Sequence, residues 1–137
     1  MPKLEIPGDI YRQMVAQARA ESPIEACGIL AGADGKVKKL YKMTNADAAS
    51  DHFMTEPAEQ FAVVKDIRSA DLEMLAIYHS HPESPARPSA EDIRLALTPE
   101  VIYVIVSLLN DEPAAKGFVM DEGDVTEVSV TIEDSQE

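Results

Sequence analysis

The run VIYVIVSLL, from Val101 to Leu109, is the most apolar stretch of the chain and the feature that most limits its fold. A helix that crosses a bilayer needs about 20 apolar residues, so this run is far too short to span a membrane. Its β-branched residues and nearly unbroken apolar character are typical of a strand in the middle of a sheet. We therefore expect a sheet with this segment as a central strand.

Three segments are predicted to be helices. Helical spacing of apolar residues predicts the first over residues 8–22, where Asp9 can cap the start. Its apolar stripe consists of Ile10, Met14, Val15 and Ala18. Pro57 is tolerated in a first turn and opens the second helix. The residues of this helix expected to face the core are Phe61, Val64 and Ile67. A third helix is predicted over 89–97.

The remaining apolar runs predict strands. They cover 25–33, 35–45, 52–56, 73–81 and, on either side of the turn 121–124, most of 115–134. The turn sequence GADG predicts that the first two form a hairpin. The order of helices and strands predicts an α/β or α+β fold, in which a mixed sheet is flanked by helices.

Length and composition favour one domain in a reducing compartment. The 137 residues, 45% of them hydrophobic, suffice for one core without disulfides. The single cysteine, Cys27, excludes an intramolecular disulfide. We expect one domain over 1–133, with 134–137 as a disordered tail. Because no basic segment followed by an apolar stretch opens the chain, a cytoplasmic location is expected.

The charge of the chain argues against nucleic acid as a partner. The net charge is −13, and the only basic cluster is KVKK at 36–39. Nucleic-acid binding needs a basic face that releases counterions from phosphates. The acidity instead suits solubility or a basic partner.

Two of the three histidines of the chain lie one residue apart, in the sequence YHSHP. On a strand, residues i and i+2 point to the same side, so His79 and His81 can bind one metal ion while Ser80 points away. A loop stiffened by three prolines then leads back to Asp92, in the first turn of the next helix. Two imidazoles, one carboxylate and a water make the catalytic type of zinc site.

Simpler interpretations of these residues stay open. Ser89 and Asp92 form the S-x-x-D pattern of a capping box, so they can serve the helix start alone. Glu25 precedes an apolar strand and is a candidate general base for a metal-bound water, although its local sequence favours a solvent-exposed glutamate. His52 is expected to have a surface or packing role rather than to line a substrate groove, and Cys27 to be a small buried thiol rather than a zinc ligand or redox gate.

The segments PIEACGILAG and HSHPESPARPSAED together resemble the JAMM, or MPN-plus, metalloproteases. The pattern of that family is a glutamate before an apolar strand, then H-[ST]-H-P, with seven residues (the proline included) between the second histidine and a serine, and an aspartate three positions after that serine. The resemblance implies a JAB/MPN domain, whose layers are similar to those of cytidine deaminases. It implies that His79, His81 and Asp92 bind Zn²⁺, that Glu25 is the general base and acid, and that Ser89 stabilises the oxyanion.

The resemblance also implies a substrate. Members of the family cleave peptide or isopeptide bonds at the C-terminus of ubiquitin-like proteins, and their single-domain prokaryotic relatives act on small modifiers and sulfur carriers with a Gly-Gly-type tail. The short chain argues against a linkage-specific deubiquitinase, and small domains with apolar edges often form homodimers. One alternative is a non-catalytic MPN-type binding module. A nucleoside deaminase is rejected because its zinc site needs a C-x-x-C pair and this chain has a single cysteine.

Overall fold

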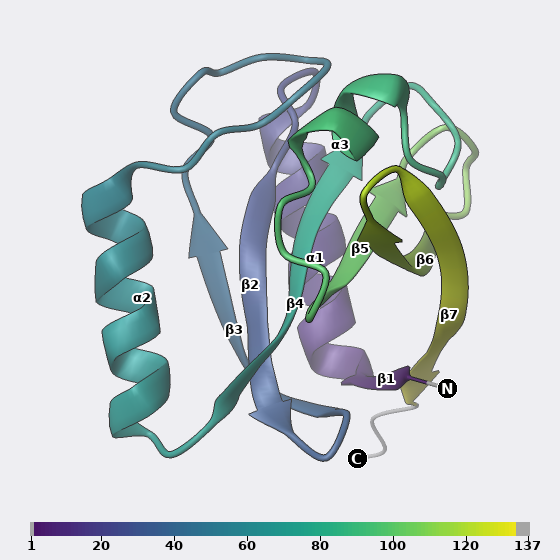
Figure 1. Cartoon of the computed structure of the whole chain (residues 1–137). Coiled ribbons are helices and arrows are strands. Elements are labelled where there is room, and N and C mark those ends of the chain that lie inside the picture. The colour runs from purple at the N-terminus through teal and green to yellow at the C-terminus, as the bar shows by residue number, and fades with distance from the viewer. Residues whose placement is uncertain (1, 134–137) are drawn as a thin grey trace.

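The computed structural model describes residues 2–133 of the chain (Figure 1). The predicted tail at 134–137 lies outside the described residues. The elements in order are β1 (Lys3–Pro7), α1 (Gly8–Glu21), β2 (Cys27–Ala33), β3 (Lys36–Met43), α2 (Pro57–Ser69), β4 (Glu73–His81), α3 (Ala90–Leu95), β5 (Ile102–Ser107), β6 (Ala114–Asp121) and β7 (Asp124–Glu133). No helix within residues 2–133 has both the length and the apolar character needed to cross a membrane.

All seven strands belong to one sheet that closes on itself. The order is β1-β3-β2-β4-β5-β6-β7, and β7 pairs with β1. The pairs β4–β5, β1–β3 and β1–β7 are parallel, and the others are antiparallel. The prediction of a mixed sheet with flanking helices is therefore confirmed, while its closure was not predicted.

Strand β5 is central, as its sequence predicts. All six of its residues are buried, and it lies between β4 and β6. Val104 and Val106 pack in the core cluster beneath α1, whereas Tyr103 and Ile105 pack on the other face, near Ile93 of α3. Strand β5 is apolar on both faces because both are covered.

The two longer helices cover opposite faces of the sheet (Figure 1). Met14 of α1 and Leu30 of β2 belong to one core cluster, while Ile67 of α2 belongs to the cluster that contains Ile29. Neighbouring residues of β2 thus face different helices, as the two-residue period of a strand requires. The β2–β3 hairpin is confirmed, and its turn residues Asp34 and Gly35 both have positive φ, at 55° and 75°.

Strand β1 was missed, because a five-residue strand that runs directly into a helix gives a weak pattern. Its residues Leu4 and Ile6 are almost fully buried. The predicted strand over 52–56 is wrong, since this segment has no regular secondary structure. The backbone of Met54 instead bonds back to Asn45 and Ala46.

The predicted details of two helices also need correction. Asp9 does not cap α1: the helix starts after Pro7 without a side-chain cap, and Asp9 lies in the first turn. In α2 the buried pair is Val63 and Ile67, four residues apart, because this stripe faces β2. Phe61, expected in the core, is 69% exposed.

Gly28 of β2 occupies a place with no room for a side chain. A Cβ atom there would overlap the Tyr78 side chain and the Tyr41 carbonyl oxygen. The Tyr78 hydroxyl cannot move freely because it donates a hydrogen bond of 2.6 Å to buried Gln17. We expect Gly28→Ala to lower the free energy of unfolding by about 1–3 kcal/mol, measured by urea denaturation. An unchanged midpoint would show that this layer of the core can shift.

Candidate metal centre

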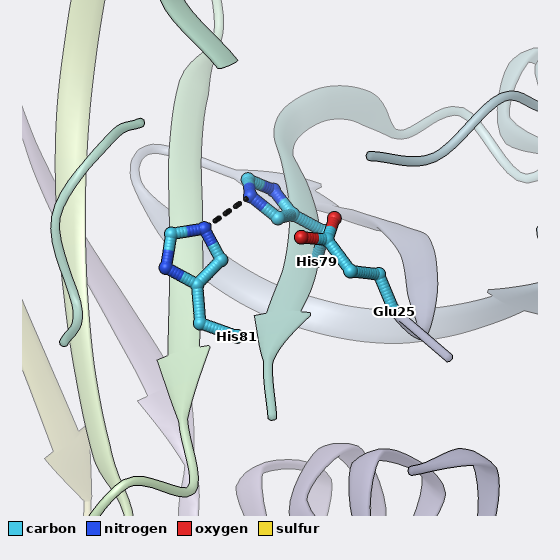
Figure 2. Close-up of side chains that lie close together, drawn as sticks. All are labelled: Glu25, His79 and His81. Atoms are coloured by element: carbon cyan, nitrogen blue, oxygen red, sulfur yellow. Dashed lines mark hydrogen bonds between the residues drawn. The ribbon is translucent and has the colours of Figure 1, made fainter. Parts of the chain in front are cut away.

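The carboxyl end of β4 presents two buried imidazoles on one face. The Nε2 atoms of His79 and His81 lie 3.2 Å apart (Figure 2). Ser80 points the other way, where its Oγ accepts a hydrogen bond of 2.8 Å from the Ala26 amide. The strand geometry expected from the sequence is confirmed, and the Ser80 contact ties β4 to the segment that precedes β2.

The proline-rich loop sets the tautomer of His81. Its Nδ1 lies 2.8 Å from the carbonyl oxygen of Pro85. A carbonyl only accepts hydrogen bonds, so Nδ1 carries the proton and donates. In neutral His81 the Nε2 lone pair is then free and faces the other side chains of the site. Such an outer hydrogen bond is the usual support of a metal-binding histidine.

Asp92 closes the third side of this group from the first turn of α3. Its Oδ2 lies 2.9 Å from His81 Nε2, and its Oδ1 lies 3.3 Å from His79 Nε2. The predicted capping box is also present. The Asp92 amide donates to Ser89 Oγ at 3.0 Å, and the Ser89 amide donates to Asp92 Oδ2 at 2.9 Å. The helix cap therefore fixes the carboxylate against both imidazoles.

Electrostatics in this group favour a bound cation. Burial alone would raise the pKa of Asp92, but its hydrogen bonds with His79 and His81 keep that pKa well below its usual value. Burial likewise opposes a charge on His81, yet Asp92 raises its pKa, whereas burial lowers the pKa of His79. The three side chains thus offer two imidazole nitrogens and an ionised carboxylate that converge on one point.

The spacing of these atoms fits zinc. A tetrahedral zinc ion with bonds of about 2.0–2.1 Å has ligand atoms roughly 3.3 Å from one another. Here the two Nε2 atoms lie 3.2 Å apart, His81 Nε2 lies 2.9 Å from Asp92 Oδ2, and His79 Nε2 lies 3.3 Å from the other carboxylate oxygen, Oδ1. Among the described residues, His79 Nδ1 has no hydrogen-bond partner, and its ring instead stacks on Phe53 with centroids 5.0 Å apart.

Glu25 lies beside the same imidazoles although its local sequence favoured solvent. It is only 3% exposed, and its carboxylate points toward the two rings (Figure 2). One ligand atom from each of Glu25, His79 and His81 fits within 4.8 Å of the others. Oε1 of Glu25 has no hydrogen-bond partner in the described part of the chain. Burial, and then the charge of Asp92, raises its pKa to about 8.

The raised pKa of Glu25 predicts how the metal-free protein responds to pH. The pKa rises from 4.5 to about 8 on folding, so the folded state favours the protonated form. The stability that this provides is complete below pH 4.5 and is lost as the pH rises toward 8. Between pH 5 and pH 8 we expect zinc-free wild type to lose stability, on the order of 2 kcal/mol more than Glu25→Gln loses. Urea denaturation at both pH values tests this, and parallel losses would contradict it.

An apolar cleft of about 240 Å³ opens beside His79 and Asp92. The other residues that line it are Gly28, Ile29, Met43, Phe53, Met54, Thr55, Gln60, Ile77, Leu95, Ala96, Leu97, Thr98, Tyr103 and Met120. Met54 and Leu97 are exposed at its surface. Such a cleft suits a largely apolar ligand that reaches the candidate metal ligands.

Two other candidate residues, Cys27 and His52, are not among the candidate metal ligands, although Cys27 pairs with His79 across β2 and β4. Cys27 is buried in the cluster beneath α2, where burial raises the pKa of its thiol to about 12. It is not part of the candidate metal group found among residues 2–133. His52 sits between Asp47 and Asp51, with each ring nitrogen 2.9 Å from a carboxylate oxygen. It does not line the cleft, so its expected surface role agrees with the structure.

Sequence reasoning missed two residues of the site. Phe53 lies in the segment wrongly predicted as a strand, and its stacking on His79 depends on how that loop folds. Asn45 follows β3 and bonds the main chain of Glu25. The only sequence signal was the position of this asparagine at the boundary between an apolar strand and a polar loop.

The chain is similar to known proteins over most of its length. A family model described as prokaryotic homologs of the JAB domain matches residues 7–120. The chain is 36% identical to the CysO-cysteine peptidase of Mycobacterium tuberculosis over 132 residues, which cover 94% of this chain and 90% of that protein. It is 27% identical to the desampylase of Pyrococcus furiosus, covering 90% and 86% of the two chains. A solution structure from Desulfitobacterium hafniense is 39% identical with a TM-score of 0.88, covering 98% and 95%.

Proposed function

The chain belongs to the prokaryotic homologs of the JAB domain, and from that premise we propose that it is a zinc metallopeptidase. Its substrate would be a peptide or isopeptide bond at the C-terminus of a ubiquitin-like or sulfur-carrier protein. The observation that carries the proposal is the buried group of Glu25, His79, His81 and Asp92 beside an apolar cleft. Relatives named as a CysO-cysteine peptidase and a desampylase support the substrate class.

The distances divide the roles among these side chains. Asp92 oxygens lie within 3.3 Å of both imidazoles, so His79, His81 and Asp92 would hold the ion. Bound zinc would acidify a water molecule and polarise the scissile carbonyl. Glu25 lies beside the same imidazoles, and we assign the proton transfers of the reaction to it.

Glu25 would move a proton from the attacking water to the leaving amine. Its carboxylate is buried and has no hydrogen bond at Oε1, so it can bond a water molecule there. A nearby cation favours its ionised form, which opposes the rise in pKa that burial causes. The carboxylate can therefore accept a proton in one step and return it in the next.

Ser89 would stabilise the charge that develops on the scissile oxygen. Its Oγ already accepts a hydrogen bond from the Asp92 amide, which leaves the hydroxyl proton available to another acceptor. Because the capping box holds this hydroxyl in place, little reorganisation is needed during the reaction.

A direct test incubates the zinc-loaded protein with a β-grasp protein whose Gly-Gly tail continues into a C-terminal extension. Two substrates are needed, one with a peptide bond after the tail and one with an isopeptide bond to lysine. Mass spectrometry of the products identifies the bond that is cut. A purified protein without stoichiometric zinc would favour the alternative, a binding module without catalysis.

Further expectations accompany this proposal. The matched region 7–120 supports one domain over 1–133. The single buried thiol, Cys27, suits the reducing cytoplasm. No nucleic-acid partner is expected for a chain with a net charge of −13. A homodimer stays a prediction, which sedimentation of the purified chain would test.

A further inference from the structure

Asn45 has an unusually complete set of hydrogen bonds for a residue outside the metal centre. It follows the end of β3 and is only 5% exposed. Its Nδ2 lies 3.0 Å from the carbonyl oxygens of Glu25 and His52 and 3.3 Å from that of Ala49, so its two hydrogens are shared among three acceptors. Its Oδ1 accepts from the amides of Met54 at 3.1 Å and Asp47 at 3.2 Å. One carboxamide therefore closes the loop 45–54 upon itself.

The same loop holds the main chain of Glu25 on both sides of its Cα. The Glu25 carbonyl accepts a hydrogen bond from Asn45 Nδ2, and the Glu25 amide donates a hydrogen bond of 2.9 Å to the carbonyl of Ala49. Asn45 Nδ2 also bonds that Ala49 carbonyl. Glu25 precedes β2 and has no strand partner of its own, so this loop determines where its side chain starts.

The far end of the loop forms a wall of the cleft. The Met54 amide donates a hydrogen bond to Asn45 Oδ1, and the Met54 carbonyl accepts a hydrogen bond of 2.7 Å from the Ala46 amide. Phe53, the preceding residue, stacks on the His79 ring. Phe53 and Met54 both line the cleft. Asn45 thus connects the candidate base to the surface that would hold the substrate.

We propose that Asn45 is a positioning residue that fixes the position of Glu25 relative to the cleft wall formed by Phe53 and Met54. This inference rests on the proposed peptidase function. Only a side-chain amide supplies two donor hydrogens and an acceptor oxygen at this length. Aspartate offers acceptors alone, and serine is too short to span the loop. A small displacement of Glu25 would misalign it with the water that it must deprotonate, and misplacement of about 1 Å can cost about 100-fold in rate.

The kinetic test compares Asn45→Ala and Asn45→Asp with a matched control, Gln17→Leu. Gln17 is also a buried amide and bonds Glu21, the Cys27 carbonyl at 3.0 Å and the Tyr78 hydroxyl; none of these hydrogen bonds is to Glu25, and Gln17 does not line the cleft. With the C-terminally extended β-grasp substrate, we expect kcat of both Asn45 variants to fall about 10–100-fold. Zinc affinity should stay within about twofold of wild type, and kcat of Gln17→Leu within about threefold.

A second measurement does not depend on catalysis or zinc. In native-state hydrogen exchange, the amides of Asp47 and Met54 should exchange at least about tenfold faster in Asn45→Ala than in wild type. The Ser80 amide, which bonds the Ala26 carbonyl at 2.9 Å, should be unaffected.

Several outcomes would overturn this role of Asn45. They are a kcat within twofold of wild type for Asn45→Asp, an equal loss in Gln17→Leu, or unchanged exchange at Met54. If the wild type itself cleaves no substrate, the proposed function fails, and the exchange result still decides whether Asn45 holds the loop.

Discussion

Replacement of Glu25 by glutamine is expected to lower kcat by about 10²–10⁴-fold while zinc stays bound, the range typical of a lost general base. Glutamine keeps the shape of the side chain but cannot accept the proton of the attacking water. The substitution removes no hydrogen bond at Oε1 of Glu25, which has no partner among the described residues. Cleavage of the extended β-grasp substrate and zinc content by mass spectrometry measure the two effects separately.

A matched control for this variant is Glu73→Gln. Glu73 is an exposed glutamate at the opposite end of β4 from the histidines. Its replacement by glutamine changes the net charge by the same amount as Glu25→Gln does. We expect it to keep wild-type kcat and zinc content. If Glu25→Gln retained more than a tenth of the wild-type rate, another group would have to be the base. If it lost its zinc, Glu25 would be a ligand rather than a base.

Replacement of Asp92 by asparagine is expected to weaken zinc binding at least about 100-fold and to abolish cleavage. The variant keeps the size of the side chain and an oxygen that can accept from the Ser89 amide, so the start of α3 can still be capped. It removes the negative charge that faces both imidazoles at 2.9 and 3.3 Å. A three-ligand zinc site depends on that charge, since neutral amides are poor zinc ligands.

The control for Asp92 is its neighbour Glu91, which forms an exposed ion pair with Arg94 at 2.6 Å. Glu91→Gln changes the same turn of α3 and the same net charge without facing the metal site. Zinc that binds only the folded state raises Tm. We expect this rise in wild type and Glu91→Gln, and none in Asp92→Asn at equal zinc. A normal zinc-induced rise in Asp92→Asn would contradict the assignment of Asp92 as a ligand.

Much of the site could be predicted because its parts follow local rules. His79 and His81 share a face through the two-residue period of a strand, and the S-x-x-D pattern places Ser89 and Asp92 in a helix cap. The segment 52–56 was predicted wrongly because its structure depends on a contact with a residue outside the segment. Its extended residues find no neighbouring strand, because Asn45 bonds the Met54 amide from across the loop. The spacing of residues within the segment does not predict that contact.

The sequence by itself determined the central strand, the pair of imidazoles, the helix cap and the net charge of −13, since each depends on residues near one another or on composition. Only the tertiary structure decided that Glu25 is buried beside the two imidazoles. Its neighbours in the chain are compatible with solvent, and it becomes buried because the loop 45–54 and β4 pack against it from distant parts of the sequence. The closure of the sheet by β1 and β7 has the same origin. Contacts between segments that far apart depend on the packing of the whole core, which local sequence patterns do not encode.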